Sequence, residues 1–218
     1  MTELTRANED TATDRYFYDP ARGHGLKADP FKAVVCPRPI GWISTRAANG
    51  AANIAPYSFF NAVCDAPPAI AFASDGWKDS VSNIVETREF AFNLVSHALL
   101  HKMNETAIRH PRGTDEFLAA AIESAPCRKI SVPMVAKSPA VLECKLLNIV
   151  ELCDIDGQKT EYKLVIGQVV GVHLSKSLLV DGLFRAEAAM PVMRAGYRGE
   201  YIQISPDCRF TLERPPGS

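Results

Sequence analysis

The chain has 218 residues, a formal net charge of −1 and 47% hydrophobic residues. This length and composition are typical of a globular protein that buries its own core, and we expect one domain over residues 15–208. The balanced charge shows no basic stripe and argues against nucleic acid as a partner. No apolar run reaches the roughly 18 to 20 residues that span a bilayer, which argues against a membrane partner.

Both ends of the chain are polar or rich in turn-forming residues. Residues 1–14 are predicted to form a flexible arm, and residues 209–218 a loose tail that contains Pro215, Pro216 and Gly217. The opening segment lacks the hydrophobic centre of a signal peptide, so a cytoplasmic location is expected. The six cysteines have no close paired spacing, which argues against a zinc knuckle. Most of them are expected to be reduced and partly buried.

Small polar residues interrupt two apolar segments, 38–45 and 53–61, that otherwise have the pattern of barrel strands. Pro56 lies within the second segment, and a proline cannot donate a hydrogen bond to a strand ladder. A strand interrupted in this way exposes neighbouring main-chain groups, and Asn53, Ser58 and Asn61 add donors and acceptors. The pattern indicates a site for the polar edge of a flat heterocycle.

Three aromatic residues follow Pro56 closely. Tyr57, Phe59 and Phe60 offer stacking surface for a ring, or they belong to the core. We expect at least two of them in the core, because aromatic residues at strand spacing usually face the interior.

A helix is predicted to begin near residue 80. Apolar residues at positions 81, 84 and 85 have helical spacing, and Ser80 is a suitable N-cap. The free amides and the positive end of the helix dipole would lie beside Lys78 and Asp79, an arrangement that holds a phosphate monoester. A capped helix beside a lysine is common, however, and capping alone satisfies such amides in most proteins.

The remaining elements are mostly strands. The sequence predicts a strand over residues 90–95, a helix over 98–107, a shorter helix capped by Thr114 and ending at Ile122, and strands over 140–152, 162–174 and 178–184. Asp156 and Gly157 indicate a turn. Gly167 and Gly171 lie inside a predicted strand and indicate a bend or a close backbone contact. The strands do not alternate regularly with helices, which favours a mainly β barrel with peripheral helices.

Several sequence signatures are absent. The chain has no glycine-rich dinucleotide turn, no phosphate-binding loop of the nucleotide hydrolases and no nucleophile elbow. His97, His101 and Glu105 are spaced four apart on the predicted helix and would share one face. An exposed helical face often carries such residues, and the prediction is that the protein has no metal site.

Together these segments resemble the flavin reductase-like, FMN-binding split-barrel family. The matching motifs, over about residues 15–200, are Arg38–Thr45, Asn53–Asn61, Lys78–Asn83, Met103–Ala107 and Gly113–Phe117. The last two motifs resemble a branch that includes flavoredoxin-type proteins and the flavin reductase partners of monooxygenases. The resemblance implies an FMN-binding split β-barrel.

The resemblance also implies a set of cofactor contacts. FMN would be bound without a covalent link at the interface of a homodimer. The implied contacts are Ser44, Thr45 and Arg46 to the phosphate and ribityl chain, Asn53, Ala55, Pro56, Tyr57 and Ser58 to the isoalloxazine, and Lys78, Asp79 and Ser80 to the phosphate. Asn104 and Glu105 would close one edge of the pocket. Arg38 is left with two roles, a cofactor contact or an ion pair at a strand start.

The activity that the resemblance implies is that of an NAD(P)H-dependent flavin reductase. NADH or NADPH would pass a hydride to FMN, and no catalytic side chain would be required because the cofactor carries the chemistry. The electrons would then leave to oxygen, to a monooxygenase or other acceptor protein, or with released flavin. Two alternatives remain: a flavoredoxin-like electron carrier or redox sensor that needs a protein partner, and a barrel that has lost its cofactor.

Overall fold

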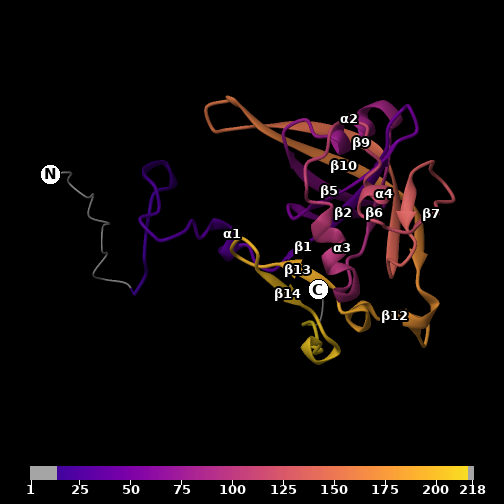
Figure 1. Cartoon of the computed structure of the whole chain (residues 1–218). Helices are drawn as coiled ribbons and strands as arrows, with labels where there is room; N and C mark the ends of the chain where they lie inside the picture. Colours follow the sequence, from indigo (N-terminus) through magenta and orange to yellow (C-terminus); the bar gives the residue numbers. More distant parts are fainter. Residues whose placement is uncertain (1–13, 216–218) are drawn as a thin grey trace.

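The computed structural model describes residues 14–215 and is mainly β (Figure 1). The strands of its largest sheet are, in spatial order, β3 (Ala52–Tyr57), β2 (Gly41–Arg46), β6 (Glu89–Asn93), β9 (Ala140–Cys153), β10 (Lys159–Leu174), β5 (Pro68–Asp75) and β4 (Phe60–Asp65). Smaller sheets are formed by β1 (Arg38–Pro39), β13 (Val192–Arg194) and β14 (Tyr201–Gln203), by β7 (Ser124–Pro126) and β8 (Pro133–Val135), and by β11 (Leu179–Val180) and β12 (Leu183–Phe184). The helices are η1 (Pro20–Arg22), α1 (Phe31–Val34), α2 (Asp79–Thr87), η2 (His97–Leu99), α3 (Leu100–Glu105), α4 (Glu116–Ala119), η3 (Lys176–Leu178), η4 (Ala186–Ala189) and η5 (Pro206–Cys208).

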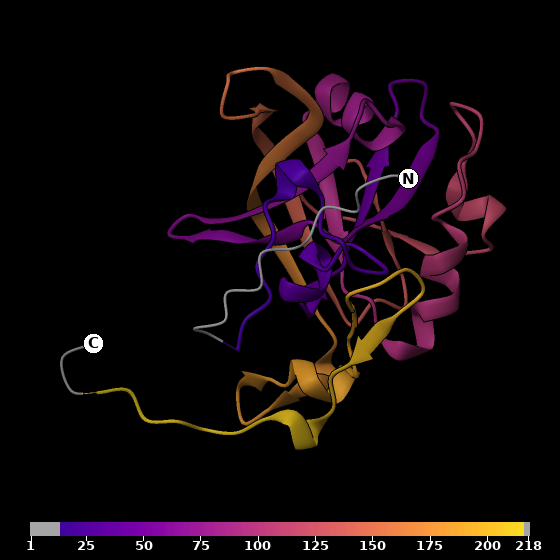
Figure 2. The same ribbon diagram turned by 90° about the vertical axis from the view of Figure 1, so that its left-hand side faces the viewer.

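The largest sheet is antiparallel throughout and curls into a barrel. Strand β3 stands at one edge of the order, yet it contacts β5 near the opposite edge, so the ends of the sheet approach each other. Figure 2 shows the strands wrapping around a common interior, with the helices outside. The predicted class, mainly β with peripheral helices, is confirmed.

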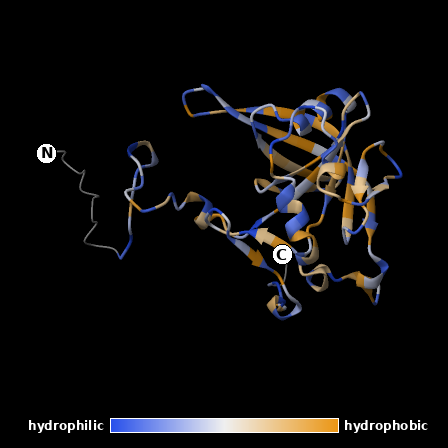
Figure 3. Ribbon diagram, viewed as in Figure 1, coloured by the Kyte–Doolittle hydropathy of each residue, from blue (hydrophilic) through white to orange (hydrophobic). Residues whose placement is uncertain are grey.

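Apolar residues alternate along the strands and build two main clusters. One lies inside the barrel and includes Ile43, Phe72 and Phe90, all fully buried, together with Val81 and Ile84 of α2. The other lies outside β2 and β3, where Trp42 and Ile54 pack against Met103 and Phe117 of the short helices. Figure 3 shows the hydrophobic residues concentrated on the strands. Adjacent positions of β2 therefore face opposite clusters, as the two-residue period of a strand requires.

Aromatic residues after Pro56 enter the core as expected. Tyr57 is 5% exposed and belongs to the cluster inside the barrel, and Phe60 packs against the same cluster. Phe60 stacks on Phe92 with ring centroids 4.7 Å apart. The prediction that at least two of the three residues lie in the core is confirmed.

The glycines of β10 mark irregular pairing with β9. Register shifts fall between Ile166 and Gly167 and between Val169 and Gly171. A Cβ atom at Gly167 would lie 2.4 Å from the Phe90 ring, and one at Gly171 would lie 3.0 Å from the Glu143 carboxyl carbon. The predicted bend and close contact are both confirmed. The turn at Asp156–Gly157 is confirmed too, since Gly157 adopts a φ of +79° between the strands.

Some predicted boundaries are wrong because local side-chain hydrogen bonds differ from those expected. The N-cap of α2 is Lys78, not Ser80, and no side chain caps this helix. Asp115, not Thr114, caps α4: its carboxylate accepts a hydrogen bond from the Leu118 amide, whereas the Thr114 hydroxyl donates to the Pro111 carbonyl. This helix ends at Ala119 rather than Ile122.

Two further segments divide where single elements were expected. The predicted helix over 98–107 is the 3-10 turn η2 followed by α3, which ends at Glu105. The predicted strand over 178–184 is the hairpin of β11 and β12. Its turn consists of Asp181 and Gly182, both with positive φ, a pairing typical of tight hairpins.

The structure describes only part of the two chain ends for which a flexible arm and a loose tail were predicted. Residues 1–13 of the predicted arm lie outside the described residues. Residues 209–215 contain no helix or strand, and Arg209 pairs with Glu187 at 3.1 Å. All six cysteines are free; Cys144 is buried, Cys36 and Cys127 are partly buried, and the other three are exposed, so burial is less general than predicted. Within residues 14–215 no helix is both long and apolar enough to cross a membrane.

Candidate functional site

A cavity of about 410 Å³ opens beside the edge strand β3. Its wall is made by β3, by residues 75–80 at the start of α2, by residues 106–110 after α3, and by Glu116. This volume lies within the range of small-molecule and cofactor sites. Seven of the eleven predicted contacts line it: Asn53, Ala55, Pro56, Tyr57, Lys78, Asp79 and Ser80.

The other four predicted contacts lie outside this wall. The Ser44 hydroxyl is buried and donates to the Pro133 carbonyl at 2.7 Å. Thr45 is buried one layer behind the cavity. Arg46 donates to the carbonyls of Ser131 and Gly50, and Ser58 follows β3 at its end. The structure therefore places seven of the predicted contacts in the cavity wall and the other four outside it.

A buried chain of hydrogen bonds holds Asn53 in the wall. The Asn83 amide donates to the Thr45 hydroxyl at 3.0 Å, and that hydroxyl donates to the Asn53 Oδ1 atom at 3.2 Å. The Ser80 hydroxyl donates to the same oxygen at 2.8 Å. The two hydroxyls donate to Oδ1, which identifies the other amide atom of Asn53 as Nδ2, a donor that can serve a ligand in the cavity.

The first turn of α2 supplies positive potential to the cavity. Its leading N–H groups have no intrahelical acceptors, and the dipole places partial positive charge there. Lys78 stands immediately before this turn, with its Nζ atom 5.8 Å from the centre of the Tyr57 ring. Arg109 and Lys78 line the same cavity as Asp75, Asp79 and Glu116. An anion is therefore favoured at the helix end rather than throughout the cavity.

The open edge of β3 explains how the sheet accommodates Pro56. Strand β3 pairs only with β2, and the Ile54 amide donates away from β2 to the Glu116 carboxylate at 2.9 Å. Main-chain groups two residues apart on a strand point the same way, so Pro56 also faces the open edge. There its missing N–H costs no ladder bond. The Pro56 carbonyl remains available to the polar edge of a ligand.

The Tyr57 hydroxyl is a buried polar group at this wall. It lies near Ser74 and Ser80, yet it makes no hydrogen bond of good geometry within the described residues. Burial raises the pKa of Tyr57, although the neighbouring serine hydroxyls oppose that shift. A buried hydroxyl without a partner is unfavourable, and a ligand with polar atoms would satisfy it.

Glu116 is the main residue of this wall that the sequence did not single out for binding. It is 8% exposed, and burial raises its pKa from 4.5 to about 7, while the hydrogen bond from Ile54 opposes the shift. A carboxyl group with this pKa exchanges a proton readily at neutral pH. Its position in the Gly113–Phe117 motif was the available signal. The hydrogen bond from Ile54 could not be predicted, because the two residues are 62 positions apart in the sequence.

Glu116 should make stability depend on pH. The native protein holds a proton on this carboxyl between pH 4.5 and about 7, where the unfolded chain has released it. Stability is therefore lost as the pH rises through this window, by at most roughly 3 kcal/mol. Glu116→Gln keeps an acceptor for Ile54 but cannot ionise. In urea unfolding, the difference in free energy of unfolding between this variant and the wild type should grow in favour of the variant from pH 5 to pH 8. The same pH dependence in both proteins would contradict the raised pKa of Glu116.

The segment after α3 forms the opposite wall and is anchored to the barrel. The buried Trp42 side chain donates to the Thr106 hydroxyl at 2.9 Å, and Thr106 begins the lining residues 106–110. Asn104 instead accepts a bond from Tyr201, and Glu105 pairs with Lys102. Neither residue lines the cavity, so the predicted edge lies a few residues further along.

Side-chain positions bear on two alternatives that the sequence left open. His97 and His101 are not brought together with Glu105 as a metal-binding group anywhere in residues 14–215. His97 lies in η2, before α3 begins, which breaks the single helical face on which that spacing depended. Arg38 forms no ion pair within these residues; its guanidinium donates to the carbonyls of Lys32, Val35 and Ala195.

Comparisons with known proteins agree with this architecture. An uncharacterized protein of Deinococcus radiodurans is 39% identical over 181 residues, covering 78% of this chain and 77% of its own length. The structure of nitrilotriacetate monooxygenase component B from Bacillus cereus is 26% identical, with a TM-score of 0.81 over 92% of this chain and 100% of its own. Flavoredoxin of Desulfovibrio vulgaris is 22% identical and shares the fold, with a TM-score of 0.72 over 84% of this chain and 93% of its own.

The family relationship covers most of the chain. Residues 34–188 match the family described as the flavin reductase like domain. This match includes β2, β3, α2 and α4, the elements that surround the cavity. The curled sheet is accordingly a split barrel of the flavin reductase fold. The protein belongs to the flavin reductase-like family and has the fold of its flavin-related oxidoreductases.

Proposed function

We propose that the protein binds FMN in the cavity beside β3 and acts as an NAD(P)H-dependent flavin reductase. The observation that carries the proposal is the meeting, in one cavity, of a helix N-terminus with Lys78 and an open strand edge with unpaired polar groups. The first suits a phosphate and the second suits the polar edge of a ring. FMN carries both groups.

Each part of the cofactor has a proposed set of partners. The phosphate would lie against the first amides of α2, close to Lys78 and Ser80. The isoalloxazine would lie along β3, where the Asn53 amide nitrogen and the Tyr57 hydroxyl can donate hydrogen bonds. Thr45 and Asn83 would act from behind by holding Asn53 in place. Ser44, Arg46 and Ser58 remain proposed contacts, although they do not line the cavity.

When bound, FMN supplies a ring that accepts a hydride from NADH or NADPH. The chain then has to hold the ring with one face open and keep its orientation constant, since close alignment of two rings accounts for most of the rate. The Pro56 carbonyl and Asn53 fix the ring edge. Glu116 can hold a proton at neutral pH beside this wall, although no catalytic side chain is required.

The test is an absorption spectrum after FMN addition and desalting, followed by anaerobic titration with NADH and then with NADPH. We expect retained flavin absorbance that bleaches with one of the two nucleotides, which also identifies the donor. Retained flavin without bleaching would indicate an electron carrier that depends on a partner protein. Failure to retain flavin under any condition would contradict the cofactor site itself.

We also propose a homodimer. Residues 14–30 run away from the barrel in Figure 1, and apolar side chains on and after this segment are exposed, among them Phe17 at 65% and Val34 at 79%. A second copy would remove these groups from water. Analytical ultracentrifugation of the flavin-loaded protein should give a dimer, and a monomer that retains FMN would contradict this.

The proposal extends to the cellular compartment of the protein and to the acceptor of its electrons. Six free cysteines suit a reducing compartment, and we propose the cytoplasm. Component B of nitrilotriacetate monooxygenase resembles this chain, which makes a monooxygenase a candidate acceptor for the electrons, alongside oxygen and other electron-acceptor proteins.

A further inference from the structure

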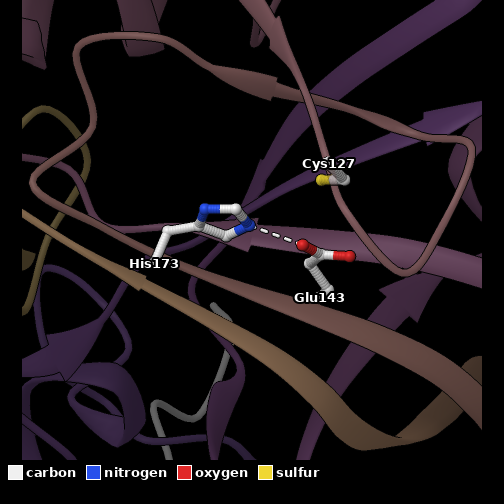
Figure 4. A group of neighbouring side chains, drawn as sticks. All are labelled: Cys127, Glu143 and His173. Atoms are coloured by element: carbon white, nitrogen blue, oxygen red, sulfur yellow. Dashed lines mark hydrogen bonds and ion pairs between the residues drawn. The ribbon is translucent and has the colours of Figure 1, made fainter.

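A second group of polar side chains lies outside the flavin cavity. Cys127, Glu143 and His173 each offer a ligand atom, and these atoms all lie within 4.8 Å of one another (Figure 4). They come from the segment between β7 and β8, from β9 and from β10. None of them lines the cavity beside β3, so this group is independent of the proposed function.

The strand pairing explains why Glu143 and His173 meet. Glu143 stands opposite Gly171 in the β9–β10 ladder, and His173 lies two residues further along the same face. Diagonal neighbours of this kind are within reach of long side chains. Gly171 leaves room for the carboxylate, because a Cβ atom there would approach its carbon to 3.0 Å. The register shift beside Gly171 changes the direction in which the neighbouring side chains of β10 point.

Glu143 is held as a buried carboxylate. It is 1% exposed, and its oxygens accept hydrogen bonds from the amides of Arg128 at 2.8 Å and Lys129 at 2.6 Å. These bonds and the one to His173 lower the pKa of Glu143 against the opposing effect of burial. Main-chain donors that orient a carboxylate in this way are the usual outer support of a metal ligand.

His173 and Glu143 contact each other directly. The His173 Nε2 atom lies 2.5 Å from Glu143 Oε1, a hydrogen bond that the Nε2–H tautomer of the imidazole donates to the carboxylate. Figure 4 shows the imidazole directed at the carboxylate, with the Cys127 thiol approaching from another segment. Burial, followed by the charge of Glu143, raises the pKa of the Cys127 thiol to about 12.

We propose that Cys127, Glu143 and His173 form a binding site for a divalent transition-metal ion, Zn²⁺ in the first place. A thiolate, an imidazole and a carboxylate together favour zinc over magnesium or calcium, which prefer oxygen ligands alone. Three protein ligands leave a fourth tetrahedral position for water. The His173 side chain is 22% exposed and lines a surface cavity of about 530 Å³, which provides access for the ion.

Binding has a defined proton balance and a small structural change. The thiol releases its proton to water, and the proton that the imidazole donates from Nε2 to Glu143 moves to Nδ1, so that Nε2 can bind the metal and one proton is released in all. Ligand atoms of a tetrahedral zinc ion lie roughly 3.5 Å apart, so the three groups must rearrange by about 1 Å. Cys127 lies in an irregular segment between two short strands, where such a movement is easiest.

Cobalt binding to the reduced full-length protein tests the site, since Co²⁺ reports its ligands by absorption. We expect one Co²⁺ per chain with a thiolate-to-cobalt charge-transfer band, and displacement of Co²⁺ by Zn²⁺. Cys127→Ser should abolish the band and weaken cobalt binding by more than about 100-fold. This exceeds the loss of affinity expected when a residue that only hydrogen-bonds to a ligand is removed. Cys208→Ser is the matched control: this thiol is exposed and its pKa is lowered by hydrogen bonds from Ser205, so it is the rival ligand.

A second variant keeps the test decisive if Cys127→Ser fails to fold. His173→Ala alters a partly exposed side chain and should weaken cobalt binding at least tenfold, while circular dichroism shows a folded protein. Binding that is absent in the wild type would overturn the proposal. So would a charge-transfer band that persists in Cys127→Ser or disappears in Cys208→Ser, or an unchanged affinity in His173→Ala.

Discussion

Replacing both Lys78 and Ser80 with alanine is expected to weaken FMN binding by about 10- to 1,000-fold while the barrel stays folded. A charge-assisted hydrogen bond contributes roughly 1.5–3 kcal/mol, and the serine adds a neutral bond of about 1 kcal/mol. The fold tolerates the change, because Asn53 keeps its bond from Thr45 and Lys78 contributes only a cation–π contact. Affinity is measured by quenching of flavin fluorescence.

The matched control for this variant is Lys176→Ala combined with Ser177→Ala. These two residues also lie at a short helix start, and neither lines the cavity beside β3. The control should bind FMN as the wild type does. Equal affinity of the Lys78 and Ser80 variant and the wild type would mean that the phosphate does not lie at the start of α2.

Trp42→Ala is expected to lower the free energy of unfolding by about 3–5 kcal/mol, as found for large aromatic residues in a core. Trp42 is fully buried between β2 and the short helices, and its indole N–H binds Thr106. The substitution removes packing and also releases the segment that forms one wall of the cavity. A loss of this size is a large share of the roughly 5–15 kcal/mol that stabilises a domain.

The second tryptophan of the chain provides the control for this prediction. Trp77 is 59% exposed, so Trp77→Ala should change stability by less than about 0.5 kcal/mol. Trp42→Phe keeps most of the burial and loses only the bond to Thr106, which should cost about 1 kcal/mol. Urea unfolding followed by circular dichroism measures all three variants. Similar midpoints for Trp42→Ala and Trp77→Ala would contradict the described core.

Local sequence patterns predicted most of the strands and the start region of α2, and the family resemblance named seven of the residues that line the cavity. The strand pattern of residues 38–45 and 53–61 and the helical spacing of Val81 and Ile84 depend on neighbours in the chain. The helix formed as predicted, whereas the first strand segment is divided between β1 and β2 and the second between β3 and β4. Pro56 indicated an exposed main chain, and the structure shows why: it faces the open edge of the sheet. The N-cap of α2 was predicted wrongly, because it depends on whether the Ser80 hydroxyl finds a tertiary partner. Ser80 binds Asn53 instead of capping its own helix.

Contacts between distant segments were decided only by the tertiary structure. Glu116 has a raised pKa because α4 buries it against the edge of β3. Its partner there, Ile54, is 62 residues away along the chain. Cys127, Glu143 and His173 have no spacing that suggests a site. Glu143 and His173 meet as diagonal neighbours on two long strands, and the segment after β7 brings Cys127 to them. His97, His101 and Glu105 had the suggestive spacing, yet His97 lies in a 3-10 turn before the helix that carries the other two. Spacing determines contacts only within one regular element, whereas burial and pairing across the barrel depend on the packing of the whole chain.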